Sequence, residues 1–343
     1  MDRILITGGT GFIGSHVVRY FCENKVIVGC LVRTGSSHKN IEGLPVKFEY
    51  GDIKDLESLI NLFKNYDCII HLAGYAFDWG SYEMFYNTNV EGTMNVLKAC
   101  TKNGIKNVII TASVSVYGEE NNNTIKSELS PYNSHYDYFI DKFFPCKLNY
   151  YRDTKALAKQ KAIEYAKGNG LNLTVLEPAW VYGEREFNTG FFEYLKTVKS
   201  GLPILPGSKK NKFHVIYAGD LARAYYLAFE KKLQGINDII IGNETGELMD
   251  KIYGLFCEKA GMKKPFNGSK FIFYPFGFIL ELIYTIFRVK KPPLMTRGRV
   301  NMFYDNIEYS TKKAERLLGF TQEMGLYEGI EKTVNWYKKK NLL

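Results

Sequence analysis

The feature that most constrains the fold is a glycine-rich loop close to the N-terminus. It reads Thr7-Gly8-Gly9-Thr10-Gly11-Phe12-Ile13-Gly14, follows the apolar run Arg3–Thr7 and precedes a helical pattern. Glycines in this context allow a tight turn and let backbone N–H groups approach a pyrophosphate at the N-terminus of the next helix. The loop therefore predicts dinucleotide binding, with cofactor contacts from Gly8, Gly11, Phe12, Ile13 and Gly14.

The first half of the chain alternates short apolar runs with helical periods, which is typical of parallel βαβ units. The predicted strands are Arg3–Thr7, Val26–Val32, Val46–Tyr50, Cys68–Ala73, Asn107–Ser113 and Asn172–Glu177. The predicted helices are Ser15–Glu23, Leu56–Lys64, Gly92–Lys102 and Thr154–Lys167. We expect an α/β fold in which a doubly wound parallel (Rossmann) sheet occupies residues 1–178, with an aromatic insertion at about 120–149. A smaller C-terminal substrate-binding lobe is expected over 179–343, from which about 213–241 return to the sheet domain.

Composition excludes several other classes of protein. The 343 residues, 45% of them hydrophobic, exclude a disordered or low-complexity chain. The formal charge of +9 favours an acidic partner, and a dinucleotide phosphate suffices; nothing indicates nucleic acid or a metal. Six scattered cysteines and no apolar stretch of 18 residues predict a cytoplasmic protein with reduced thiols.

The residue that ends the second strand distinguishes the two nicotinamide dinucleotides. A carboxylate there accepts hydrogen bonds from the ribose hydroxyls, whereas an arginine pairs with a 2′-phosphate. Arg33 stands at this end with no acid beside it, so we predict NADP. NAD is the alternative, with Arg33 solvated or stacked on the adenine. Asp52 and Ile53 are predicted to contact the adenine, although Asp52 could instead cap the helix that begins near Asp55.

Tyr151 and Lys155 are spaced four residues apart at the start of a predicted helix, which places both side chains on one face. A phenol becomes a usable acid or base at neutral pH when a neighbouring cation favours the phenolate. The fifth predicted strand ends in a hydroxyl-rich stretch, Thr111-Ala112-Ser113-Val114-Ser115. A hydroxyl there can polarise a carbonyl, so the pattern indicates acid–base chemistry on an oxygen-bearing substrate.

These residues resemble the extended short-chain dehydrogenases/reductases of the NAD(P)-dependent epimerase/dehydratase family. The loop at 7–14 is similar to the family's T-G-G-x-G-x-x-G, and Tyr151 with Lys155 to its Y-x-x-x-K. Further similarities are His71-Leu72-Ala73-Gly74, Asn87-Thr88-Asn89-Val90-Glu91-Gly92-Thr93 and Pro178-Ala179-Trp180-Val181-Tyr182-Gly183. The motifs follow the family's order through most of residues 1–220.

The resemblance implies a role for each matching residue. Tyr151 would be the acid/base, Lys155 would lower its pKa and contact the nicotinamide ribose, and Ser113 would orient the substrate oxygen. Thr111 and Ser115 are the neighbours that could be mistaken for Ser113. Cofactor contacts are implied for Leu72, Ala73, Gly74, Thr111, Tyr151, Lys155 and Pro178, and substrate contacts for Ser113, Tyr117 and Tyr182. A homodimer through the Gly92 and Tyr151 helices is expected by analogy with the family.

The sequence constrains the branch of the family less than it constrains the family itself. Val114-Ser115 stands where the sugar-nucleotide dehydratases carry Asp-Glu, which disfavours that branch. We expect interconversion of a secondary alcohol and a ketone on a hydrophobic, sterol-like or polyketide-like substrate, as in the dihydroflavonol-reductase-like and 3β-hydroxysteroid-dehydrogenase-like members. The alternatives are a nucleotide-sugar epimerase, in which Arg297 or Arg299 would pair with a diphosphate, and a non-catalytic dinucleotide-sensing module.

Aromatic residues concentrate in two segments, Tyr132–Phe144 and Phe271–Phe287. The first is expected at the mouth of the active site or as a surface excursion packed on the C-terminal lobe. The second is followed by Arg288, Lys290 and Lys291. An apolar segment flanked by cations suits a membrane interface or a cap over the pocket of a hydrophobic substrate, so 271–291 is a candidate for peripheral membrane contact; the other interpretation is one or two core helices.

Overall fold

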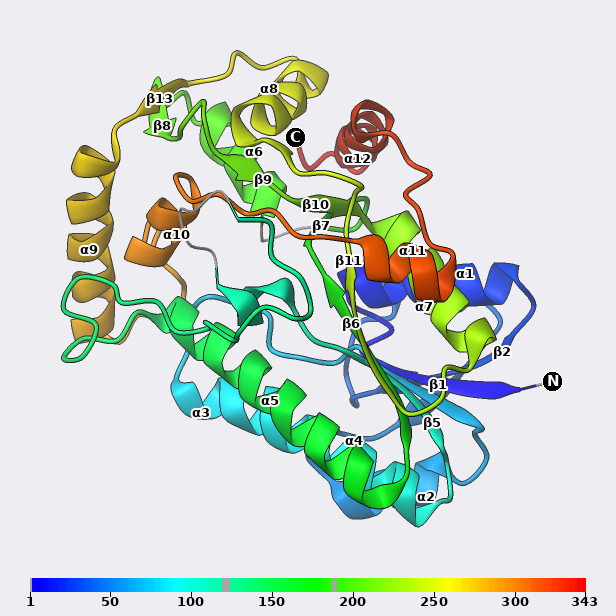
Figure 1. Cartoon of the computed structure of the whole chain (residues 1–343). Coiled ribbons are helices and arrows are strands. Elements are labelled where there is room, and N and C mark those ends of the chain that lie inside the picture. The colour runs from blue at the N-terminus through cyan, green and yellow to red at the C-terminus, as the bar shows by residue number, and fades with distance from the viewer. Residues whose placement is uncertain (1, 119–123, 187–189) are drawn as a thin grey trace.

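The computed structural model describes residues 2–118, 124–186 and 190–343 (Figure 1). Its central sheet has seven parallel strands in the order β11-β6-β5-β4-β1-β2-β3. Their bounds are β1 Arg3–Thr7, β2 Ile27–Val32, β3 Val46–Tyr50, β4 Cys68–His71, β5 Asn107–Thr111, β6 Asn172–Pro178 and β11 Ile236–Ile241. The strand order reverses between β1 and β4, the switch point at which ligands of such sheets bind. The predicted fold class is confirmed.

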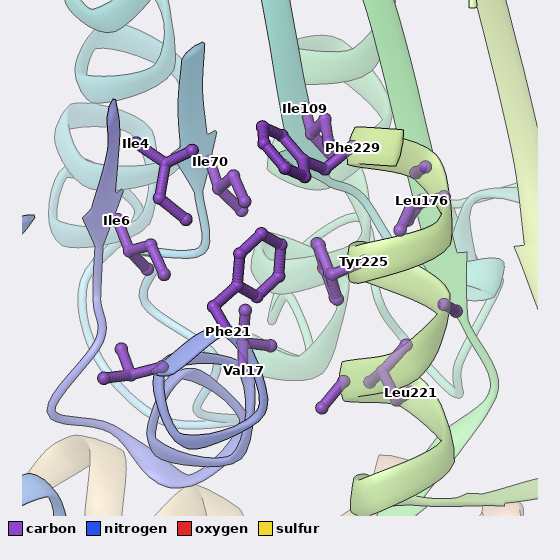
Figure 2. Packing of buried hydrophobic residues seen from close by; sticks show 14 of the residues in the cluster. Ile4, Ile6, Val17, Phe21, Ile70, Ile109, Leu176, Leu221, Tyr225 and Phe229 are labelled. Carbon is purple, nitrogen blue, oxygen red and sulfur yellow. The ribbon is translucent and has the colours of Figure 1, made fainter. Parts of the chain in front are cut away.

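Helices cover both faces of the sheet, because alternate strand residues point to opposite sides. Ile4 and Ile6 face α1 (Phe12–Glu23) and α7 (Ala218–Lys231) (Figure 2). Residues of α11 (Lys312–Leu318) belong to the same cluster. Leu5 faces the opposite layer, which consists of α2 (Leu56–Phe63), α4 (Gly92–Lys102) and α5 (Lys147–Asn169). β4 and β5 are covered by helices on both sides, which explains why their sequences are continuous apolar runs.

Short irregular elements follow the strand ends. They are the 3-10 turns η1 (Lys39–Ile41) and η3 (Val114–Tyr117), the helix α3 (Tyr82–Phe85) and the wide π turn η2 (Tyr86–Glu91), which leads directly into α4. Because all seven strands are parallel, their carboxyl ends lie at one edge of the sheet. The connections η2 and η3 therefore lie beside the predicted site.

The second lobe lies at that edge and has its own aromatic core. It contains three two-stranded pairs: β7 (Trp180–Tyr182) with β10 (Val215–Tyr217), β9 (Lys212–Phe213) with β12 (Glu247–Leu248), and β8 (Ile204–Pro206) with β13 (Phe266–Gly268). Its helices are α6 (Gly190–Lys199), α8 (Met249–Ala260), α9 (Lys270–Ile286), α10 (Arg297–Met302) and α12 (Leu326–Lys339). Within the described parts of the chain, no helix is long and apolar enough to cross a bilayer.

The element bounds differ from the predictions at several points. β4 and β5 each end two residues early, and Ser113 instead caps η3 by accepting a hydrogen bond from the Ser115 N–H. Helix α5 begins at Lys147 rather than Thr154, so Tyr151 already lies in its second turn. β11 and α7 follow residue 178 but belong to the sheet layers, and the lobe boundary at 178 stays a prediction. Residues 120–123 of the predicted insertion lie outside the described residues.

Candidate active site

The glycine loop forms a cradle in which side chains would not fit. Gly8 has a φ of +75°, and a Cβ there would lie 2.6 Å from the backbone nitrogen of Ala73. A Cβ on Gly14 would lie 2.1 Å from the carbonyl oxygen of Gly8. Helix α1 starts after Gly11 with no side-chain cap and no acid in its first turn. Bare backbone at an uncapped helix N-terminus fits a pyrophosphate, so these residues suit the predicted dinucleotide.

The two predicted adenine-side residues lie at the same edge of the sheet. Leu31 of β2 pairs with Thr7, and Val32 pairs with Tyr50 of β3, so Arg33 and Asp52 each stand just past a paired strand end. Arg33 is exposed, and no partner for its guanidinium occurs among the described residues. Its charge therefore remains available to a ligand.

Asp52 is not the cap of the following helix. Asp55 itself caps α2 by accepting a hydrogen bond of 3.1 Å from the Ser58 N–H. The Asp52 carboxylate accepts the Lys54 N–H at 2.9 Å through Oδ1, and its second oxygen has no partner among the described residues. The neighbouring Ile53 is buried.

The loop after β4 is fixed to β1 through His71. Thr7 Oγ1 lies 2.7 Å from His71 Nδ1, and the Ala73 N–H donates to the same hydroxyl at 3.2 Å. On the other side of the ring, Nε2 lies 3.0 Å from the Thr93 hydroxyl. Burial, with the nearby Lys155 charge, lowers the pKa of His71 to about 3. The imidazole is therefore neutral and holds the loop Leu72–Gly74 in place rather than acting as a base.

Asn89 holds the same loop from the opposite side, a role that sequence reasoning did not assign. Its Oδ1 accepts the Tyr75 N–H at 2.7 Å, and its Nδ2 donates to Thr154 Oγ1 at 3.1 Å. Asn89 is buried in η2, where the wide turn directs it between the loop and α5. The conspicuous Asn87-Thr88-Asn89 run was the available signal, but only the structure shows which of the two asparagines turns inward.

Two of the three predicted catalytic residues lie at the end of β5, and the third lies on the helix packed beside it. Lys155 Nζ donates a 2.9 Å hydrogen bond to the carbonyl of Thr111, and burial lowers the pKa of this lysine to about 8. Ser113 lies two residues further along the chain, is buried, and accepts a 2.9 Å hydrogen bond from the Ser115 hydroxyl. Tyr151 lies one helical turn before Lys155 on α5, which packs against η3. Lys155 and Ser113 therefore lie at the same strand end, and Tyr151 precedes Lys155 by one turn of the same helix; their catalytic roles stay predictions.

The Thr111 hydroxyl is already engaged inside the protein. It donates to the carbonyl of His71 at 3.1 Å and lies 2.5 Å from the hydroxyl of Tyr225. Pro178, the other predicted contact at this edge, is the last residue of β6 and is buried beside Ile241 of β11. Thr111 and Pro178 therefore lie at the carboxyl ends of two neighbouring strands.

The two tyrosines predicted to contact substrate lie in the interior. The Tyr117 hydroxyl donates to Glu177 at 2.7 Å and accepts from Lys159 at 2.8 Å. Tyr182 is fully buried in the second-lobe core, and its hydroxyl has no hydrogen-bond partner among the described residues. Neither placement directs a hydroxyl to Lys155, and the substrate contacts of these tyrosines stay predictions.

The surroundings of Tyr151 are aromatic and apolar. Tyr138, Cys146 and Leu148 form a buried cluster, against which Tyr151 packs with Tyr136, Tyr274 and Met302. Tyr136 and Tyr138 belong to the insertion, whereas Tyr274 comes from α9 and Met302 from α10. The insertion therefore packs on the C-terminal lobe at Tyr151.

Both arginines considered for a substrate diphosphate are bound to protein carboxylates. Arg297 is fully buried, and its Nε and Nη2 donate to Glu281 at 2.9 and 3.1 Å. Arg299 forms a two-pronged pair with Asp78, with Nη2 2.8 Å from Oδ1. Neither guanidinium is free for a phosphate in this arrangement.

The parallel sheet, the glycine cradle at its switch point and the Tyr–Lys pair on α5 define an NAD(P)-dependent enzyme of the extended short-chain dehydrogenase/reductase type. The model of the NAD dependent epimerase/dehydratase family matches residues 4–242, and the chain belongs to that family. Its members include both dehydrogenases and epimerases, so the family alone leaves the substrate open.

Known proteins of both kinds are similar to this chain over its whole length. A putative UDP-glucose 4-epimerase of Methanocaldococcus jannaschii is 31% identical, over 98% of this chain and 99% of the relative. A 2-alkyl-3-oxoalkanoate reductase of Stenotrophomonas maltophilia is 25% identical, over 96% and 98%. The crystal structure of the Thermotoga maritima UDP-glucose 4-epimerase with UDP-glucose superposes with a TM-score of 0.77 over 99% of both chains, at 24% identity, and shows the shared fold.

Proposed function

We propose that the protein interconverts a secondary alcohol and a ketone on a hydrophobic substrate, with Tyr151 as the acid/base. The Tyr151 hydroxyl gives its proton to the substrate oxygen during reduction and accepts it during oxidation. The buried ammonium of Lys155 stabilises the phenolate left behind, and the Ser113 hydroxyl donates a hydrogen bond to the same substrate oxygen. A bound nicotinamide supplies or accepts the hydride in this chemistry.

The cofactor proposed for this site is NADP. The cradle of Gly8 and Gly14 suits the pyrophosphate of either dinucleotide. The preference rests on Arg33, an exposed cation just past β2, where a 2′-phosphate would sit. Asp52, with one carboxylate oxygen unused by the protein, is suited to accept a hydrogen bond from the adenine amino group.

The observation that carries the substrate class is the apolar cluster around Tyr151. Tyr136, Tyr274 and Met302 pack on the same buried cluster as Tyr151, and an apolar environment of this kind favours an aliphatic or ring hydrocarbon body over a sugar. The Glu281 and Asp78 pairs of Arg297 and Arg299 add to this, because a diphosphate would have to displace a carboxylate. The similarity to a 2-alkyl-3-oxoalkanoate reductase supports the same class.

Nucleotide-sugar epimerisation is the second candidate, and the 31% identity to a putative UDP-glucose 4-epimerase favours it. The same three residues would serve that reaction, since it also passes through a ketone. The two candidates differ in cofactor balance. An epimerase regenerates its dinucleotide in every cycle, whereas a reductase converts one molecule of cofactor for each molecule of substrate.

A cofactor-absorbance screen separates the candidates. Wild-type protein is mixed with NADPH or NADH and either hydrophobic ketones or UDP-sugars, and both the absorbance and the sugar configuration are followed. We expect net oxidation of the cofactor with ketones and no epimerised sugar; the reverse pattern would select the epimerase. In Tyr151→Phe we expect turnover to fall by at least about 100-fold while dinucleotide binding persists. Unchanged turnover would remove Tyr151 from the mechanism.

A further inference from the structure

Helix α9 presents an unusually apolar outer face. Phe271 is 92% exposed and Phe287, just past the helix end, is 75% exposed. The other large apolar residues that are exposed along the helix are Ile272, Phe276, Ile279, Ile283 and Ile286. Soluble monomers rarely expose a contiguous apolar patch of this extent, and such patches mark interaction surfaces. The exposure of these side chains argues against core helices and favours an interfacial segment.

The inner face of the helix is firmly attached to the lobe, so the exposed side is fixed in place. Gly277 lies against the backbone of Thr296, where a Cβ would approach to 3.1 Å. Glu281 is buried in its ion pair with Arg297. Figure 1 shows α9 along the outer edge of the molecule, with α10 on its inner side. The apolar face therefore belongs to a packed element rather than to a frayed segment.

The tip of the insertion extends this surface. Phe139 and Phe144 pack edge-on against Phe278 of α9, with ring centroids 5.4 and 6.1 Å apart. Next to them Ile140 is exposed and Phe143 is 91% exposed. We call the exposed residues of α9 and of the tip at 139–143 the apolar face.

The exposed charges that flank α9 in the sequence are all positive, and one exposed carboxylate, Asp137, stands two residues before the tip of the insertion. Arg288, Lys290 and Lys291 follow the helix and are exposed, and Lys270 opens it. From 266 to 294 the only acidic residue is Glu281, which is buried and paired. An amphipathic helix with aromatic and aliphatic residues outward and cations at its ends matches an anionic lipid surface in both apolar area and charge.

We propose that the apolar face docks the protein on the surface of an anionic bilayer, with α9 lying in the interface. Tyr274, on the same helix, packs in the cluster that contains Tyr151. Docking therefore places the acid/base next to the membrane, from which a hydrophobic substrate enters. This delivery step rests on the proposed function, whereas the docking itself does not.

Cosedimentation with vesicles tests the docking. Wild-type protein is mixed with vesicles of phosphatidylcholine alone or of equal parts phosphatidylcholine and phosphatidylglycerol, at low and high salt. We expect binding to the anionic vesicles that weakens with salt. The double variant Lys290→Gln/Lys291→Gln should bind about 25-fold more weakly, since each cation contributes about fivefold. Phe271→Asp should reduce binding at least about tenfold.

Matched control variants distinguish vesicle binding through the apolar face from non-specific vesicle binding. Leu129→Asp changes a side chain that is 95% exposed outside this face, and Lys339→Gln/Lys340→Gln removes two exposed charges elsewhere. Both should bind like the wild type. Equal losses in the controls, or no binding of the wild type to anionic vesicles, would overturn the proposal. A sedimentation experiment in which Phe271→Asp converts a dimer to a monomer would assign the face to a second copy of the chain instead.

Turnover of a water-soluble ketone without vesicles distinguishes the two proposals. If only docking is wrong, the wild type and Phe271→Asp turn over equally and neither binds vesicles. If only the proposed function is wrong, vesicle binding persists and no ketone is reduced.

Discussion

The ammonium group of Lys155 donates a 2.9 Å hydrogen bond to the backbone carbonyl of Thr111, which joins α5 to the end of β5. Among the described residues the group has no carboxylate partner, and burial lowers its pKa to about 8. The protein therefore maintains a charge that is unfavourable to its folded state one helical turn from Tyr151, where the proposed mechanism uses a cation. This arrangement is typical of functional sites.

Replacing Lys155 with Met should lower the turnover of the enzyme and raise its free energy of unfolding. At pH 7 the lysine is charged in both the folded and the unfolded states, and its lowered pKa means that folding bears a desolvation cost. Without that cost the unfolding free energy should rise by on the order of 1–3 kcal/mol, while turnover falls at least about 100-fold. Denaturant titration and cofactor absorbance measure the two quantities. A variant that loses stability would show that the Thr111 bond outweighs the desolvation.

Arg33→Ala tests the cofactor preference. Loss of a cation that pairs with the 2′-phosphate should weaken NADP binding by about 1.5–3 kcal/mol and leave NAD nearly unchanged. Fluorescence titration of both dinucleotides gives the comparison. Lys39→Ala, which removes another exposed cation from the same side of the sheet, serves as the control. An equal loss for both dinucleotides would place Arg33 on the adenine or in solvent.

Replacing glycine with alanine should have opposite effects on stability at two positions of the chain. In Gly14→Ala the new Cβ would lie 2.1 Å from the Gly8 oxygen, so the loop must distort and dinucleotide binding should be lost with about 2 kcal/mol or more of stability. Gly168, near the end of α5, has open space around its Cβ position. Gly168→Ala should stabilise by about 0.5–1 kcal/mol without affecting binding. Thermal denaturation with and without cofactor distinguishes the two variants.

His71 should make the protein acid-sensitive. Its pKa is about 3 in the folded state, below the ordinary value, so the unfolded chain takes up a proton first as the pH falls through about 6.5. Stability is therefore lost with falling pH, by up to about 1.4 kcal/mol per pH unit from this residue. His71→Asn should reduce the slope of unfolding free energy against pH between pH 6 and 4 by about that amount. An unaltered slope would contradict the assignment of a neutral histidine.

The sheet layers are predictable from the sequence because each unit is determined locally. The bounds of β1, β3 and α4 match the prediction, since apolar strand runs and a helical period each fit within one short segment. The end of β5 differs because Ser113 leaves the strand to cap η3, where it accepts a hydrogen bond from the Ser115 N–H. The position of Lys155 followed from its spacing to Tyr151, but its bond to Thr111 depends on how α5 packs.

The C-terminal lobe could not be predicted in the same way. Whether Arg297 faces a ligand or Glu281 depends on the placement of α9 against α10, which no local pattern determines. The sequence of the apolar run Phe271–Phe287 is compatible both with a core helix and with an interfacial helix, because composition does not reveal which face of the helix is covered. Asn89 likewise acquires its role only once η2 widens and turns it inward.

The buried guanidinium of Arg297 contacts three separate segments at once. It binds Glu281 of α9 and the carbonyls of Phe139 and Phe144 in the insertion, while its own backbone begins α10. None of these segments can detach without leaving a charge unpaired in the interior. The three segments should therefore open as one cooperative unit, and their backbone amides should be protected from hydrogen exchange to a similar degree. The structure that they form beside Tyr151 is then either wholly closed or wholly open.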